Sequence, residues 1–215
     1  MTESSYGIIL RTRPLTETSL IVHWLTPDLG RLATVAKGAR RPKSPFQGKL
    51  DLFYGADFSF SRSQRSELHS LREASLRETH SAIRQDIFKL QQAGYAAALI
   101  EQTTESETPI PEIFELVRDF LKTLCATNPE PQTILALELK LLRELGLEPD
   151  ADELRLTPGS KKIAEALVEG NWDSMARLKL SNSQVAELAQ FLHGFLIFHV
   201  GRVPRGRAAA LEKTV

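Results

Sequence analysis

Residues 19–37 read SLIVHWLTPDLGRLATVAK and predict a β-hairpin. The two ends of this run, residues 19–26 and 30–37, are rich in apolar and β-branched side chains, which are typical of strands. Between them the sequence Pro-Asp-Leu-Gly at residues 27–30 supplies a turn, with proline early and glycine last. The hairpin therefore marks the first part of the chain as β-rich.

Three more strands are expected around this hairpin. Residues 6–12 carry the β-rich run YGIILRT, and residues 67–75 are expected to form the last strand. Residues 50–60 alternate between an apolar face, which includes Phe58, and an outer face, which includes Phe53. Five short antiparallel strands suit a small barrel, and the expected architecture is an OB-fold.

After residue 79 the apolar residues recur with the period of a helix. Helices are expected over residues 83–103, from Pro111 onward, over residues 134–145 and 158–170, and after a capping box formed by Ser181 and Gln184. The helix over residues 134–145 has two apolar stripes and should be buried on most sides. The sequence predicts an α+β protein with an OB-fold domain over residues 1–79 and an all-α helical domain over residues 80–215.

The charge of the chain is divided between these two parts. The 215 residues include 27 Lys and Arg and 27 Asp and Glu, so the formal net charge is zero. Residues 11–49 hold 8 basic and 2 acidic residues, a net charge of +6, whereas residues 81–198 hold 11 and 18, a net charge of −7. A neutral total therefore does not exclude a nucleic-acid ligand, because it is the sum of a basic barrel and an acidic helical part.

Several other classes of protein are disfavoured. The single cysteine, Cys125, excludes an intramolecular disulfide framework and a cysteine-rich zinc site. The sequence contains no Walker-type phosphate loop and no nucleophile elbow, so we expect no enzyme and no cofactor. His193 lies among apolar residues and is expected to pack in the core. No apolar run is long enough for a membrane span, and we expect a cytoplasmic protein.

The densest group of cations follows the hairpin. Residues 37–43 read KGARRPK and continue into a segment rich in Gly, Pro and Ser, which favours an exposed loop. Exposed Lys and Arg neutralise phosphates and bind nucleic acid with little sequence preference. The candidate nucleic-acid-binding residues are Lys37, Arg40, Arg41, Lys43 and Lys49, together with Arg11, Arg13 and Arg31 on the strands and Phe46 as a ring that stacks on bases. The alternative is a solubilising loop without a ligand.

Motifs on either side of this loop are similar to those of a known family. RPLTETSL at residues 13–20 and GRLATVAKGARR at residues 30–41 closely resemble the bacterial recombination mediator RecO family, and LLRELGLEP at residues 141–149 extends the likeness. The resemblance implies an OB-fold followed by helices. By position, it implies that Lys37, Arg40, Arg41 and Lys43 belong to a DNA-binding loop.

The function implied by this resemblance is that of a non-enzymatic DNA-repair protein. Such a protein would bind single- and double-stranded DNA and anneal complementary strands. Its implied partners are RecR, the acidic C-terminal tail of single-stranded DNA-binding protein (SSB) and, indirectly, RecA on gapped DNA. Two alternatives stay open: an OB-fold RNA-binding protein, and a helical protein-interaction adaptor without a direct DNA role.

The chain departs from that family in two places. Residues 148–170 contain no cysteine, so the four-cysteine zinc site of many members is missing. After the last long helix, residues 201–207 read GRVPRGR in place of the family's Leu-Lys-Ser-Arg element. We expect Arg202, Arg205 and Arg207 to form an anion site for an acidic tail, with a solvated C-terminus as the alternative.

Overall fold

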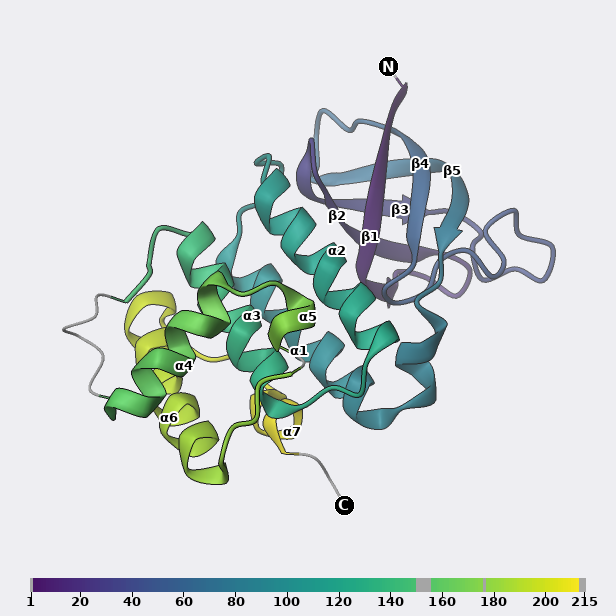
Figure 1. Cartoon of the computed structure of the whole chain (residues 1–215). Coiled ribbons are helices and arrows are strands. Elements are labelled where there is room, and N and C mark those ends of the chain that lie inside the picture. Colours follow the sequence, from purple (N-terminus) through teal and green to yellow (C-terminus); the bar gives the residue numbers. More distant parts are fainter. Residues whose placement is uncertain (1, 150–155, 176, 213–215) are drawn as a thin grey trace. The chain divides into compact units, whose positions relative to one another are not determined.

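The computed structural model describes residues 2–149, 156–175 and 177–212 (Figure 1). Five strands come first: β1 (Thr2–Pro14), β2 (Leu20–Thr26), β3 (Gly30–Ala36), β4 (Gly55–Ser61) and β5 (Leu68–Glu78). The helices that follow are the 3-10 helix η1 (Ser81–Gln85), α1 (Ile87–Thr103), α2 (Pro111–Ala126), α3 (Pro131–Glu144), α4 (Pro158–Glu169), α5 (Trp172–Met175), α6 (Asn182–Val200) and α7 (Arg207–Leu211). This order confirms the predicted α+β class.

The strands close into a barrel in the order β1-β2-β3-β5-β4. Four of the strand pairs are antiparallel, but β3 and β5 run parallel, which corrects the expectation of an entirely antiparallel barrel. The reason is geometric. Direction alternates along β1, β2 and β3, while β4 is antiparallel to β1 and β5 is antiparallel to β4, so β5 must run in the direction of β3. A five-stranded barrel of this topology is an OB-fold.

The predicted hairpin forms the centre of the barrel core. β2 and β3 pair from Leu20 opposite Ala36 to Thr26 opposite Gly30. The Trp24 ring stacks on the Phe58 ring of β4, with ring centroids 4.1 Å apart, and its Nε1 donates a hydrogen bond to the Thr34 hydroxyl oxygen at 2.9 Å. The indole is therefore buried with its polar atom paired, as a stable core requires.

The strand expected over residues 50–60 begins five residues later than predicted, at Gly55, and ends at Ser61. Residues 51–54 form a turn instead, in which the Tyr54 N–H donates to the Asp51 carbonyl oxygen at 3.2 Å. Phe53, predicted on the outer face, is 3% exposed and has a φ of 64°. A side-chain alternation of period two does not distinguish an extended strand from a turn whose rings fold inward.

The predicted residues at the helix ends, which act on neighbours in the sequence, are confirmed. Thr157 caps α4 through its side chain, Ser181 and Gln184 form a complete capping box on α6, and Gly146 takes a positive φ just beyond α3. Helix α3 is buried on most sides, as its two stripes predict. The expectation for His193 is wrong: it is exposed, because only Leu188, Leu192 and Leu196 of α6 are buried.

The chain divides into two compact units. One contains residues 1–80 and 104–118, and the other contains residues 81–103 and 119–215. The barrel unit thus includes a segment that follows α1 in the sequence. The domain boundary predicted between residues 79 and 80 stays a prediction, because compactness within one chain does not test which segments fold independently.

Candidate nucleic-acid interface

Residues 15–19, which join β1 to β2, are bonded to the start of the loop between β3 and β4. The Thr16 hydroxyl oxygen accepts a hydrogen bond from the Ser19 N–H at 3.1 Å. The Arg40 N–H donates to the Thr18 carbonyl oxygen at 3.0 Å, and Arg40 Nη1 donates to the Thr16 carbonyl oxygen at 3.2 Å. The two loops therefore support each other at this end of the barrel.

The loop after β3 is a chain of consecutive turns. The N–H groups of Ala39, Arg41, Ser44, Gln47 and Lys49 each donate to the carbonyl oxygen three residues earlier, at 3.0–3.3 Å. Gly38 and Gly48 have φ values of 70° and 71°, which glycine adopts without steric cost. The loop is thus an ordered structure although it contains neither strand nor helix.

Phe46 anchors the middle of this loop to the barrel. Its ring is 6% exposed and belongs to the core cluster that contains Trp24, Phe58 and Phe60. A base needs an open ring face for stacking, and this burial does not provide one. We therefore leave Phe46 out of the proposed binding surface and assign it a structural role.

The basic loop, residues 37–43, presents four exposed cations. Lys37, Arg40, Arg41 and Lys43 are all exposed, and residues 37–49 contain no Asp or Glu. Burial of Phe46 and the bonds to Thr16 and Thr18 hold the backbone that carries them. The result is a positive surface whose geometry is set before any ligand arrives.

Next to the basic loop, the outer face of β1, β2 and β3 carries further cations. Arg11 lies opposite His23, and in the next row Arg13 lies opposite Ile21. Side chains paired across a sheet point to the same face, and this face points outward because the alternate residues of β2 fill the core. Arg13 is exposed and Arg11 is half-buried.

His23 is the centre of this outer face. Burial, and after it the positive charges of Arg11, Arg13 and Arg31, together lower the pKa of the half-buried His23 imidazole to about 4. The ring is therefore uncharged at neutral pH. The sequence analysis does not single out His23. Its position was a usable signal, because His23 directly precedes Trp24 in β2 and consecutive residues of a strand point to opposite faces.

Arg31 lies on β3, but its guanidinium group is hydrogen-bonded to another part of the protein. Its Nε donates to the Thr104 hydroxyl oxygen at 2.7 Å, and its guanidinium also donates to the Thr104 carbonyl oxygen. Because these donors are used within the barrel unit, Arg31 supplies positive charge to the face but is not positioned to grip a phosphate. This corrects its predicted role as a direct contact.

The segment that engages Arg31, residues 104–108, is here called the strap. The Glu107 N–H donates to the Arg31 carbonyl oxygen at 2.7 Å, and the Glu107 Oε1 lies 2.9 Å from Nε2 of the buried His69. Arg62 bonds both Glu107 and Glu3, and this contact lowers the pKa of Glu3. The strap thus closes the side of the barrel where β3 meets β5.

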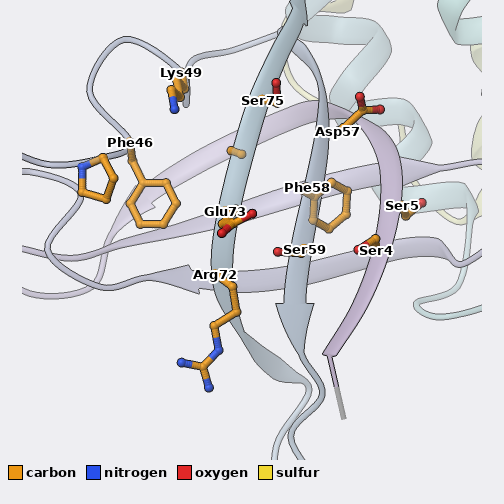
Figure 2. Close-up of a pocket in the computed structure, with 12 residues that line it drawn as sticks. Ser4, Ser5, Phe46, Lys49, Asp57, Phe58, Ser59, Arg72, Glu73 and Ser75 are labelled. Atoms are coloured by element: carbon orange, nitrogen blue, oxygen red, sulfur yellow. The ribbon is translucent and has the colours of Figure 1, made fainter.

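Lys49, six residues after the end of the basic loop, lines a groove of about 530 Å³ (Figure 2). Figure 2 shows Lys49 and Arg72 around this groove together with the carboxylates of Asp57 and Glu73. Asp57 also forms an ion pair with Arg77. The mixed charges make this groove less favourable for phosphate than the basic loop.

Of the three C-terminal arginines, only Arg202 and Arg205 are exposed. Arg207 is 8% exposed, and its Nε and Nη2 lie 2.7 Å and 2.8 Å from the carboxylate oxygens of the fully buried Glu138. The Tyr95 hydroxyl donates a third hydrogen bond to Glu138, and burial raises the pKa of Tyr95. Arg207 therefore neutralises a buried carboxylate, and its predicted role in an exposed anion site does not fit its position.

In the part of the chain that the structure describes, no helix is long and apolar enough to cross a membrane. In the same residues, no group of three or more His, Cys, Asp or Glu side chains is arranged to hold a metal ion.

Comparison with known proteins gives matches over most of the chain. The family model described as recombination protein O N terminal matches residues 1–80, and the model described as recombination protein O C terminal matches residues 84–154. The DNA repair protein RecO of Rhodopirellula baltica is 34% identical over 143 residues, which are 66% of this chain and 53% of that protein. The DNA repair protein RecO of Bacillus subtilis is 34% identical over 146 residues, 67% of this chain and 56% of that protein. These alignments span little more than half the length of the relatives.

Proposed function

This chain belongs to the recombination protein O (RecO) family, and on that premise we propose that it acts in DNA repair as a non-enzymatic recombination mediator. In this proposal it binds single- and double-stranded DNA and promotes the annealing of complementary strands. The single observation that carries the proposal is the ordered basic loop with four exposed cations and no acidic residue.

The chemistry of annealing follows from that loop. Two DNA strands repel each other through their phosphates, and Lys and Arg side chains that neutralise phosphates reduce this repulsion and release counterions. Lys37, Arg40, Arg41 and Lys43 are the proposed phosphate contacts, with Arg13 and Arg11 continuing the surface onto the strands. No covalent bond is made or broken in this action.

The proposed protein partners are RecR and the acidic tail of SSB. Through them the protein would assist the loading of RecA on SSB-coated DNA. Arg202 and Arg205 support an acidic-tail site, because both guanidinium groups are exposed on the segment between α6 and α7. Arg207 is excluded from that site by its pairing with Glu138.

A salt titration of binding to labelled single-stranded DNA tests the proposed DNA surface. With Lys37, Arg40, Arg41 and Lys43 all changed to Ala, about four phosphate contacts are lost. The slope of log K against log salt concentration should then shrink by about 3, since each contact contributes about 0.7 on a single strand.

The matched control changes four exposed cations of the other unit, Lys122, Lys162, Arg177 and Lys179, to Ala. It removes the same charge and should leave the slope unchanged. Equal slopes for wild type and the basic-loop variant contradict the proposed surface. A preference for RNA over DNA of the same sequence would favour the RNA-binding alternative, and capture of an acidic protein without DNA binding would favour the adaptor.

A further inference from the structure

Helix α6 has an apolar face that lies in solvent. Among its 19 residues, Glu187 is the only Asp, Glu, Lys or Arg. Its buried residues are Leu188, Leu192 and Leu196. On the other side of the helix, Phe198 is 83% exposed and Ile197 is 45% exposed. A helix with apolar residues on all sides is normally covered on all sides, so the solvent side of α6 indicates a docking surface.

The residues of this face are spaced like those of a helix–helix contact. Phe191, Gly194 and Phe198 follow one another at intervals of three and four residues, so they form one row along the helix. Gly194 and Phe198 are exposed, and Phe191 is half-buried. The Phe191 ring also lies beside the Phe195 ring, with centroids 5.7 Å apart. The row is therefore apolar and partly held in place by its neighbours.

Gly194, in the middle of the row, has no evident role within the chain itself. A Cβ placed on it would meet nothing within 4 Å, and its backbone is helical. A glycine inside a helix costs about 0.5–1 kcal/mol relative to alanine. What a glycine allows at this position is the close approach of another backbone to the exposed side of α6.

The two ends of the row carry opposite charges. Glu187 lies seven residues before Gly194, and the exposed Arg202 lies eight residues after it. The Glu187 carboxylate accepts hydrogen bonds at 2.5–2.9 Å from the Ser160 hydroxyl and from the N–H and hydroxyl of Thr157. These bonds, that of Ser160 first, lower the pKa of Glu187. Because the donors are neutral, the carboxylate is held in position and keeps its negative charge.

We propose that a second copy of this chain docks on α6, with the two α6 helices antiparallel about a two-fold axis near Gly194. A two-fold contact joins the same surface of both copies, so this surface has to be complementary to itself. In the antiparallel arrangement the Phe191 end of one helix lies against the Phe198 end of the other. Glu187 of each copy then lies at the end where the second copy carries Arg202.

The charges favour a second copy over an acidic peptide along α6. A peptide of that kind is attracted by Arg202 at one end of the row and repelled by Glu187 at the other. The copy of the chain presents the opposite charge at both ends. The dimer would also carry two basic loops and could hold two DNA strands in one complex. This last consequence rests on the proposed function, whereas the contact itself does not.

Sedimentation velocity of the full chain, from low to high micromolar concentration, tests the contact. A contact limited to one helix is small compared with standard interfaces of about 1,200–2,000 Å², so we expect a micromolar dimer. Wild type should shift toward twice the single-chain mass as the concentration rises. Phe198→Asp should keep the single-chain mass throughout, because the dimer would bury its carboxylate among apolar side chains.

The matched control is Ile87→Asp, the same kind of change at an apolar residue of α1 that is 66% exposed. It should dimerise like wild type. Both substituted side chains lie largely in solvent, so both variants should fold, and circular dichroism checks this.

Disulfide cross-linking under mild oxidation tests the direction of the helices, in a chain whose free Cys125 is changed to Ala. Gly194→Cys should link to itself, because the two copies of residue 194 meet at the axis and a disulfide needs Cα atoms about 4.4–6.8 Å apart. His193→Cys should not, since this exposed residue lies about 100° further round the helix. Phe191→Cys mixed with Phe198→Cys should give the linked pair, and neither variant should link to itself.

The outcomes separate this inference from the proposed function. A single-chain mass of wild type at every concentration overturns the contact, and so does a Phe198→Asp variant that dimerises like wild type. Linkage of Phe198→Cys to itself overturns the antiparallel arrangement. If wild type dimerises but binds no DNA, the proposed function fails and the contact is supported.

Discussion

Phe46 connects a binding loop to the barrel that supports it. Its ring fills part of the core beside Trp24 and Phe58, while the cations on the same loop stay in solvent. The burial energy of one aromatic side chain thus helps to hold several exposed charges at fixed places. Binding then requires less ordering of the loop, which lowers its entropic cost.

This role predicts different effects for two substitutions of Phe46. Phe46→Ala removes a buried ring and should lower the free energy of unfolding by about 3–5 kcal/mol. Phe46→Leu keeps apolar volume, so it should cost less and retain the wild-type affinity for single-stranded DNA. Urea unfolding and anisotropy titrations measure the two quantities. A Phe46→Leu variant that folds normally but binds DNA at least fivefold more weakly would show that the ring contacts bases after all.

Arg31 and Arg207 show what residue type alone does not reveal. Both are basic residues in basic stretches, yet Arg31 bonds Thr104 and Arg207 bonds Glu138, partners 73 and 69 residues away. Their local sequence resembles that of the exposed arginines. Contacts between distant segments pair these two arginines within the protein, and they are therefore not available to a ligand.

At the scale of elements, the strap and the turn before β3 depend on each other. Gly30 has a φ of 66°, and a Cβ placed on it would lie 1.9 Å from the Thr108 carbonyl oxygen. The strap therefore approaches the hairpin turn as closely as it does because residue 30 has no side chain. The same turn brings Arg31 to Thr104 and to Glu107.

Gly30→Ala should consequently displace the strap. Gly48→Ala is the matched control, since Gly48 also has a positive φ, 71°, but a Cβ there meets nothing within 4 Å. We expect Gly48→Ala to cost about 1–2 kcal/mol for the left-handed conformation alone, and Gly30→Ala to cost more. Urea unfolding compares the two, and hydrogen exchange should show faster exchange of the Glu107 N–H in Gly30→Ala only. Equal costs and unchanged exchange would mean that the strap does not press on the turn.

The elements themselves differ in how far sequence predicts them. The caps of α4 and α6 depend on residues within three positions of each other, and they form as predicted. The start of β4 was misplaced because residues 50–54 alternate like a strand while their hydrogen bonds form a turn. The strap has no periodicity and no cap, so nothing in its own sequence indicates that it lies along β3.

For the whole molecule, the contrast between a net charge of +6 over residues 11–49 and −7 over residues 81–198 should direct where DNA lies. Phosphates are attracted to the basic loop and repelled by an acidic surface. In the proposed complex, DNA is therefore confined to the barrel face.

Lysine acetylation tests this confinement. Saturating single-stranded DNA should protect Lys37 and Lys43 from the reagent, whereas Lys162 and Lys179 should react as in the free protein; all four are exposed. Mass spectrometry of tryptic peptides reports the extent of modification at each site. Equal protection of the two pairs would contradict confinement of DNA to the barrel.

The α+β class, most of the strands, the helix caps and the division of charge follow from the sequence, because each of these depends on residues that are neighbours in the chain. The parallel pairing of β3 with β5, the burial of Phe46 and Arg207, and the engagement of Arg31 by Thr104 depend on long-range contacts instead. The physical reason is that exposure and partnership depend on which distant segments meet. A basic or aromatic side chain is available to a ligand only if the protein's own carboxylates, carbonyl groups and hydrophobic core do not already bind or bury it.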